Sequence, residues 1–286
     1  MHKIIIIGAG PAGMACALQL KRYNIDALLI EANKPGGLLH NANKVENYLG
    51  FQGIKGTDLI KHFTTHLQQN DIKITQDLVR SVRHPATQSV DRGIQKNREL
   101  TLDPAVKPRD DEVQKNFEIQ GTNQTYYCEK LILATGTIPK KTDMIDERIF
   151  YEPIDVKNKN IVIVGAGDAA FDYAINMAQH NQVIILNRGI EIKALPVLQK
   201  IVAENSKINY IENARIDDYA DKADFIIFAI GRIPNKPEMV VDEEELIKQQ
   251  KLFLIGDIKN GIYRQTSLAV ADGIKAAMEI ALGNKQ

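Results

Sequence analysis

Uninterrupted apolar runs recur along the chain, and several of them are followed by segments whose apolar residues repeat at helical spacing. The runs lie at 4–7, 27–30, 131–134, 161–164, 183–186, 225–230 and 252–255. Apolar runs of this length are typical of strands buried on both faces, as in parallel sheets. The helical patterns include an Ala-rich segment after the first run, an amphipathic segment at 57–69 and a last segment at 268–282. Together these patterns predict an α/β fold.

Residues 72–119 show a different pattern, because their apolar pieces are short and alternate with polar residues. Pieces at 72–75, 78–82, 100–102 and 117–119 predict an antiparallel meander. The stretch 85–116 inside this region is rich in charged and amide side chains. We expect it to be a long polar excursion that is mobile or binds a partner.

A glycine-rich turn joins the first strand to the first helix. Its sequence, Gly8-Ala9-Gly10-Pro11-Ala12-Gly13, is Gly-x-Gly-x-x-Gly, in which missing side chains let the backbone approach a pyrophosphate at the helix N-terminus. Glu31 ends the next strand, about 20 residues further on, where a carboxylate accepts ribose hydroxyls. The alternative is an ordinary strand-turn-helix unit with an incidental glutamate. The context of strand, turn, helix and carboxylate predicts a dinucleotide site.

A second turn of the same kind follows the run at 161–164. It reads Gly165-Ala166-Gly167-Asp168-Ala169-Ala170, or Gly-x-Gly-x-x-Ala, and the next strand ends at Asn187-Arg188. An Arg at that strand end suits a 2′-phosphate, which favours NADPH and leaves NADH open. Two turns in one chain imply two dinucleotides, a tightly held flavin and an exchangeable nicotinamide.

The last third of the chain supplies further polar groups at element ends. Residues 225–235 predict a buried strand that leaves the second region, and 252–257 predict a strand that ends at Asp257. The final helix begins after Arg264-Gln265, and its positive N-terminal end suits an anionic reduced flavin.

Composition narrows the possible partners and the compartment. Lys plus Arg equals Asp plus Glu at 36 each among 286 residues, so no overall charge points to nucleic acid or a membrane. The first strand begins within two residues of Met1, so we expect no signal peptide and a cytoplasmic location. The two cysteines, Cys16 and Cys128, are expected to be buried free thiols, and no metal site is expected.

Over nearly its whole length the chain resembles the low-molecular-weight thioredoxin reductase family of flavoproteins. Further matching segments are Gly36-Gly37-Leu38, Val45-Glu46-Asn47, Ala134-Thr135-Gly136, Ala229-Ile230-Gly231 with Pro234-Asn235, and Gly256-Asp257 with Arg264-Gln265. The resemblance implies two Rossmann-like, three-layer dinucleotide-binding domains, the second inserted in the first. It places a discontinuous FAD domain at 1–141 and 230–286, and a shortened NAD(P)H domain at 142–229.

The resemblance also implies site residues and a homodimer. Gly8, Gly10, Ala12 and Glu31 would hold the AMP half of FAD, and Asn47, Asp257, Arg264 and Gln265 would lie near the flavin and its ribityl chain. The other residues expected to contact FAD are Pro11, Gly13, Gly37, Leu38, Ala134, Thr135, Gly136, Gly256 and Thr266. The residues expected to bind NAD(P)H are Gly165, Gly167, Asp168, Ala169 and Arg188.

One difference from the pattern of the thioredoxin reductase family changes the expected reaction. Thioredoxin reductases of this type carry C-x-x-C just before the second glycine turn, and residues 149–156 contain no cysteine. Without a dithiol the flavin cannot pass electrons through an internal disulfide. Thioredoxin reduction is therefore the least expected activity.

The run 167–173 looks more like the dithiol-free branch, the ferredoxin/flavodoxin–NADP reductases. That branch usually adds a C-terminal aromatic extension over the flavin, which the residues after the final helix do not supply. The nicotinamide region between Arg188 and Phe225 also looks short, and the family's paired arginines are reduced to Arg188 followed by Gly189.

We therefore expect an FAD-dependent enzyme that takes hydride from NAD(P)H and delivers electrons to ferredoxin, flavodoxin or a small oxidant. No residue is assigned as a catalytic acid or base, because the cofactors carry the chemistry. The alternative is an FAD-binding sensor or assembly protein with a decayed nicotinamide site. Connections near 137–143 and 230–235 are expected to form a hinge, with less need for rotation than in dithiol members.

Overall fold

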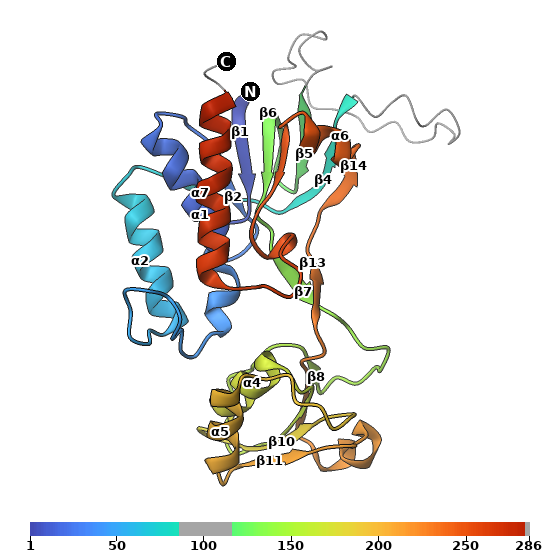
Figure 1. The fold of residues 1–286 in the computed structure, drawn as a ribbon. Coiled ribbons are helices and arrows are strands. Elements are labelled where there is room, and N and C mark those ends of the chain that lie inside the picture. The colour runs from blue at the N-terminus through green and yellow to red at the C-terminus, as the bar shows by residue number, and fades with distance from the viewer. Residues whose placement is uncertain (86–115, 284–286) are drawn as a thin grey trace, which may run out of the picture.

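The computed structural model describes residues 1–85 and 116–283 and confirms the α/β fold. It contains an eight-stranded sheet, a five-stranded sheet and a two-stranded ladder. Figure 1 shows the two larger sheets in separate units, one above the other, joined where the ladder lies. We call these the large-sheet unit and the small-sheet unit.

The large sheet combines a parallel region with an antiparallel meander. Its strands run in the order β14-β4-β5-β6-β1-β2-β3, and β15 pairs with the last part of β6. Their bounds are β1 His2–Ile7, β2 Leu28–Glu31, β3 Ile74–Gln76, β4 Val79–Arg83, β5 Phe117–Gly121, β6 Thr125–Leu133, β14 Glu238–Val240 and β15 Leu252–Leu254. The meander prediction is confirmed for β4 and β5, which pair antiparallel. Strand β6, which was not part of the prediction, continues the antiparallel pairing from β5.

Part of the predicted meander is parallel, and part of it lies outside the described residues. The piece at 72–75 was expected in the meander, but β3 pairs in parallel with β2, because it follows a crossover helix and extends the parallel edge. The strand predicted at 100–102, and nearly all of the polar stretch 85–116, lie outside the described residues.

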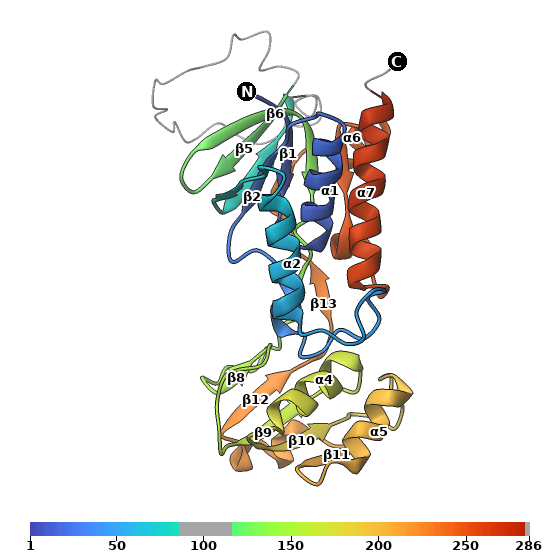
Figure 2. The same ribbon diagram turned by 90° about the vertical axis from the view of Figure 1, so that its left-hand side faces the viewer.

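Helices cover one face of the parallel region. They are α1 Pro11–Arg22, α2 Gly56–Gln68 and α7 Thr266–Gly283, and Figure 2 shows α1 and α7 side by side. Leu20 and Ile280 are fully or almost fully buried in the core that these helices form with the sheet. The opposite face packs on Phe117 of the meander and on Leu246 of the short helix α6 Glu243–Lys248.

The small sheet is entirely parallel. Its order is β11-β10-β9-β12-β8. The bounds are β8 Ile149–Phe150, β9 Asn160–Val164, β10 Gln182–Leu186, β11 Ile208–Ile211 and β12 Phe225–Phe228. Helices α4 Asp168–Met177 and α5 Pro196–Glu204 pack on one face. The sequence patterns did not predict α5 or β11.

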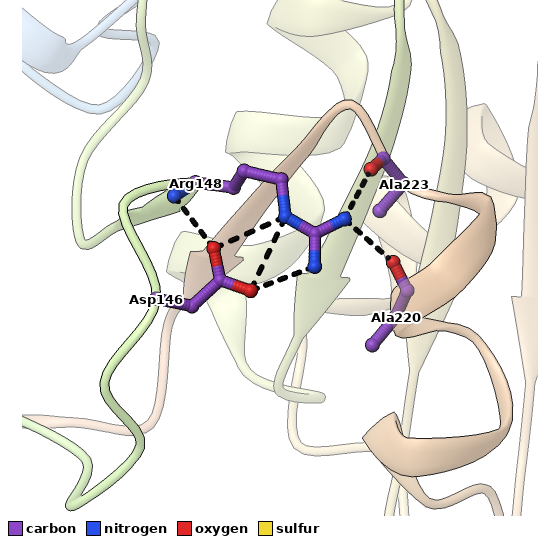
Figure 3. Close-up of polar contacts among 4 residues, drawn as sticks. All are labelled: Asp146, Arg148, Ala220 and Ala223. Atoms are coloured by element: carbon purple, nitrogen blue, oxygen red, sulfur yellow. Dashed lines mark hydrogen bonds and ion pairs between the residues drawn. The ribbon is translucent and has the colours of Figure 1, made fainter.

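Short turns cover the other face of the small sheet. The 3-10 turns at Ile216–Asp218 and Ala220–Lys222 pack over Val162, Ile226 and Phe228. Arg148 fixes this cover, since its Nη1 donates to the carbonyls of Ala220 and Ala223, both at 3.0 Å, while Nη2 pairs with Asp146 at 2.7 Å (Figure 3). A compact cover with no antiparallel strand in the described part of the unit explains why the 188–225 region looked short.

The chain passes between the units through β7 Thr137–Pro139 and β13 Arg232–Pro234, which pair antiparallel. The sequence pattern predicted one buried strand over 225–235, and this was wrong. Gly231 adopts φ +112° between β12 and β13, so the first half stays in the small sheet and the second half joins the ladder. Ile233 is 47% exposed there.

Candidate functional site

The first glycine turn leaves space where a ligand would lie. Gly8 has φ +105°, and a Cβ there would lie 2.4 Å from the carbonyl oxygen of Ala134. A Cβ on Gly13 would lie 1.9 Å from the Gly8 oxygen, whereas a Cβ on Gly10 would meet nothing within 4 Å. Two glycines are thus required by packing, and Gly10 opens the space beside the N-terminus of α1, whose N-cap has no side-chain hydrogen bond. This geometry fits a pyrophosphate.

Glu31 lies directly against that turn. Its Oε2 accepts from the Ala9 amide at 2.7 Å, and its Oε1 accepts from the Asn33 amide at 2.9 Å. A carboxylate has about four lone-pair positions, so acceptor capacity remains for ribose hydroxyls. Glu31 both fixes the turn and offers an acceptor.

Other segments singled out in the sequence gather around the same edge. The Gly36 amide donates to the Ala9 carbonyl at 2.8 Å, and a Cβ on Gly37 would lie 3.6 Å from the Gly10 Cα. The Ala134 amide donates to the Ile7 carbonyl at 2.8 Å, which sets the strand end of β6 beside that of β1. The carboxyl ends of neighbouring parallel strands form the edge where α/β sheets bind ligands.

A second group of polar residues lies at the end of β15 and the start of α7. The Asn47 Nδ2 donates to the Gln265 Oε1 at 2.8 Å, although these residues are far apart in the sequence. Burial raises the pKa of the Asp257 carboxyl, and the charges of Arg264 and Arg232 oppose that rise. Among the described residues no donor bonds this carboxyl, so Asp257 is an acceptor available to a hydroxyl-bearing ligand such as a ribityl chain.

The second glycine turn repeats the geometry of the first in the small-sheet unit. Gly165 has φ +147°, and a Cβ there would lie 2.5 Å from the Ala229 oxygen. A Cβ on Gly167 would meet nothing within 4 Å, and the N-cap of α4 has no side-chain hydrogen bond. The Asp168 carboxylate accepts from the Leu195 amide at 2.8 Å. Asp168 therefore holds the loop that follows β10 against the turn.

That loop carries the cations of the second site. Asn187 is buried, and its side-chain amide donates to Tyr210 Oη at 2.8 Å and to the Glu191 carbonyl at 3.0 Å. Arg188 is exposed and has no partner among the described residues. The Lys193 amide donates to the Ala166 carbonyl at 2.8 Å, which brings a second exposed cation to the glycine turn. Sequence reasoning missed Lys193, because only the loop's backbone bonds bring it near Gly165–Gly167.

The cysteines lie in the core and not at either site. Cys16 and Cys128 are both 0% exposed. Burial raises the pKa of the Cys16 thiol to about 12 and also raises that of Cys128. Neither thiol is disulfide-bonded, which confirms the expectation of buried free thiols. Buried thiols of this kind are inert toward disulfide exchange.

Comparison with known proteins gives the class. Residues 5–224 match the family model described as "Pyridine nucleotide-disulphide oxidoreductase", and the chain belongs to this family. Thioredoxin reductase of Rickettsia prowazekii is 27% identical, with 98% of this chain and 97% of the relative covered. Thioredoxin reductase of Bacillus subtilis is 24% identical, with 98% and 94% covered.

Solved structures agree on the fold. Thioredoxin reductase of Lactococcus lactis matches with a TM-score of 0.76 at 21% identity, over 99% of this chain and 98% of that one. The bacillithiol disulfide reductase of Staphylococcus aureus matches with a TM-score of 0.69 at 16% identity, over 100% and 99%. The Rossmann-like, thioredoxin reductase-like fold predicted from the sequence is therefore confirmed.

FAD and NADPH, the predicted cofactors, are those that thioredoxin reductases use, and both glycine turns fit a dinucleotide. Among the described residues no group of three or more His, Cys, Asp or Glu side chains could hold a metal ion. No helix in that part of the chain is long and apolar enough to cross a membrane.

Proposed function

We propose that the chain is an FAD-dependent NAD(P)H oxidoreductase that passes electrons to an external acceptor without a dithiol of its own. The observation that carries the proposal is the pair of open glycine turns, at Gly10 and Gly167, in two separate sheets. Each turn leaves space for a pyrophosphate, and one chain then holds both a donor and an acceptor of hydride. A bound flavin would accept hydride and release electrons singly or in pairs.

FAD is assigned to the large-sheet unit, residues 1–141 and 230–286, because the second group of polar residues lies there. Glu31, which already accepts from the Ala9 amide, would accept from the adenosine ribose, and Asp257 would accept from the ribityl hydroxyls. Asn47, Arg264, Gln265 and Thr266 would surround the flavin end. The remaining contacts are assigned to Gly8–Gly13, Gly37, Leu38, Ala134–Gly136 and Gly256.

NAD(P)H is assigned to the small-sheet unit, residues 142–229. Gly165, Gly167 and Ala169 would face the pyrophosphate, while Asp168 positions the loop after β10. Arg188 and Lys193 are exposed cations on that loop and have no ion-pair partner among the described residues, which supports NADPH because a 2′-phosphate attracts cationic side chains. NADH remains open as a second donor.

The acceptor is proposed to be external because the chain has no cysteine pair that could act as an internal dithiol. Its two cysteines are buried in the large-sheet unit, and residues 149–156 contain none. Electrons therefore leave from the flavin itself, as in the dithiol-free branch that resembles ferredoxin/flavodoxin–NADP reductase. Ferredoxin, flavodoxin or a small oxidant is the proposed acceptor. A homodimer and a cytoplasmic location stay predictions.

The test is anaerobic reduction of the bound flavin. NADPH added to the purified yellow protein is expected to bleach the flavin absorbance rapidly. Arg188→Ala with Lys193→Ala should raise the dissociation constant for NADPH about a hundredfold or more, and that for NADH much less, since each of the two lost charged hydrogen bonds costs about 1.5–3 kcal/mol. Lys207→Ala removes an exposed cation elsewhere in the small-sheet unit and serves as the matched control.

The second candidate is an FAD-binding sensor or assembly protein that does not turn over. The short cover of the small sheet, made of two 3-10 turns, favours it. In that case the protein would retain FAD, and neither NADPH nor NADH at millimolar concentration would bleach it. This outcome would refute the oxidoreductase.

A further inference from the structure

The two units are joined by a thin ladder. Strands β7 and β13 pair over only three residues each, with Arg232 opposite Pro139. Figure 1 shows the ladder lying between the two units, and Figure 2 shows its strand β13 there. Ile138 and Ile233 of the ladder are 41% and 47% exposed, so little apolar packing stiffens it. Something other than the ladder must fix the angle between the units if that angle matters.

Arg232 makes contacts that the ladder alone would not require. Its Nε donates to Thr137 Oγ1 at 3.0 Å, and its Nη2 donates to the Thr137 carbonyl at 2.9 Å. Its Nη1 lies 3.2 Å from Glu152 Oε1, and the Arg232 side chain is only 13% exposed. Thr137 belongs to the first connection, Arg232 to the second, and Glu152 to the chain between β8 and β9. One guanidinium thus ties both connections to the small-sheet unit.

The charge of Arg232 also acts on a titratable group of each unit, the buried Tyr173 and the half-buried Asp257. Burial raises the pKa of the Tyr173 phenol on α4, and the Arg232 charge opposes this rise. The same charge opposes the raised pKa of Asp257 in the large-sheet unit. Among the ion pairs between described residues, Arg232–Glu152 alone joins the connections to the small-sheet unit.

We propose that the Arg232–Glu152 pair is a clamp that fixes the angle between the two units, and that Arg232 is thereby a positioning residue for hydride transfer. The role in hydride transfer rests on the proposed function. Reacting atoms must approach to about 3–3.5 Å, and a misplacement of about 1 Å can cost a hundredfold in rate. A planar guanidinium that holds Thr137 and Glu152 at once resists rotation better than a single exposed ion pair would.

A distance measurement tests the clamp without depending on any activity. Cys16 and Cys128 are fully buried, so spin labels would react with new cysteines at the exposed positions Thr65 on α2 and Ser206 after α5. The purified flavoprotein should give one narrow distance distribution. Glu152→Gln keeps the size of a 40% exposed side chain and removes its charge, and it should at least double the width of the distribution.

Glu243→Gln is the matched control, since Glu243 pairs with Lys236 at 2.6 Å wholly within the large-sheet unit. Its distribution should equal that of the parent protein. An unchanged distribution in Glu152→Gln, or a broad one in the parent protein, would overturn the clamp. Glu152→Asp should restore part of the narrow distribution.

Flavin reduction tests the positioning role. At saturating NADPH, Glu152→Gln should lower the rate of flavin reduction about tenfold, while the dissociation constant of NADPH changes less than about twofold. Arg232→Lys keeps the charge and loses the planar fork. It should likewise lower the rate of flavin reduction and leave the dissociation constant of NADPH nearly unchanged. A broadened distribution with an unchanged rate would refute the positioning role. Absence of any reduction by NADPH in the parent protein would refute the proposed function and leave the distance result to decide the clamp.

Discussion

At the residue scale, the glycines of the first turn look alike in the sequence but are needed for different reasons. Gly13 is required by packing, because a Cβ would collide with the Gly8 carbonyl at 1.9 Å. Gly10 is not required by packing, because its Cβ would meet nothing within 4 Å. The open position is the one that a ligand needs.

Alanine substitutions distinguish the packing requirement at Gly13 from the ligand space at Gly10. Gly13→Ala should destabilise the protein by on the order of 2 kcal/mol, since the helix must shift to relieve the overlap. Gly10→Ala should leave the unfolding midpoint of the FAD-free protein unchanged. It should lower the FAD content of the protein as purified, since the new methyl group occupies the open space. Urea unfolding and the ratio of flavin to protein absorbance measure these effects. Equal FAD contents in Gly10→Ala and the parent protein would contradict the assignment of this turn.

Asp172, on α4, is the residue whose titration should be visible in the stability of the protein. Burial and the nearby Asp168 raise the pKa of its carboxyl from 3.8 to about 6, so the folded state favours the protonated form. This contribution is complete below about pH 4 and is lost as the pH rises through 6. Asp172→Asn should therefore increase the free energy of unfolding at pH 7.5 by about 1–2 kcal/mol, allowing for solvent screening, and should change nothing at pH 4.

The control for this prediction is Asp218→Asn, which removes an exposed carboxylate from the same unit. Urea unfolding at pH 4 and pH 7.5 would show a pH-dependent difference for Asp172→Asn alone. The same gain at both pH values would contradict the link to ionisation.

At the element scale, the packing of α1 on α7 fixes where the final helix lies relative to the first glycine turn. A Cβ on Gly273 of α7 would lie 2.2 Å from the Ala12 carbonyl and 2.9 Å from the Cys16 amide, so the backbones are in near contact. Gly256, just before Asp257, lies against the same helix, since its Cβ would lie 2.8 Å from the Ala12 Cβ. Gly273 and Gly256 therefore let α7 and the turn before Asp257 pack directly against α1, the helix that follows the first glycine turn.

Gly273→Ala should displace α7 from α1. We expect a loss of on the order of 2–3 kcal/mol of stability, larger than the gain in helix propensity of about 1 kcal/mol, together with faster FAD release. Gly283→Ala at the end of α7 is the control, because its Cβ would meet only the Gln250 side-chain oxygen at 3.3 Å. Thermal unfolding followed by flavin fluorescence measures both. Equal unfolding midpoints for Gly273→Ala and the control would show that the helices have room to adjust.

Elements differ in how well the sequence predicted them. Strands β1, β9 and β10 are long apolar runs and were predicted because each run is buried on both faces. Helix α6 was not predicted, although Asp242 is its N-cap and accepts from the Glu245 amide at 3.1 Å. The Asp-x-x-Glu signature was present, but the helix has six residues and buries only Leu246. A capping signature alone does not make so short a helix stable. The tertiary contacts of Leu246, which the local pattern does not show, are also needed.

At the scale of the whole molecule, an N-terminal and a C-terminal part of the chain together form the large-sheet unit. Strand β15 pairs with β6 and α7 packs on α1, while residues 149–228 form a sheet of their own. The small-sheet unit is thus inserted in the large-sheet unit, and the assignment of a dinucleotide to each unit stays a prediction. The two glycine turns lie in the two units that the ladder connects, so the proposed hydride transfer would depend on how the connections hold the units.

The sequence by itself determined the two glycine turns, the carboxylate at Glu31, the cation at Arg188 and the absence of a dithiol. These features are local, because a pyrophosphate site needs only a strand, a turn and a helix that are consecutive in the chain. Tertiary structure alone decided the break at Gly231, the approach of Lys193 to the second turn and the contact of Arg232 with Thr137 and Glu152. Those features join residues that are far apart in the chain, and their partners are set by packing and not by any periodicity of the sequence.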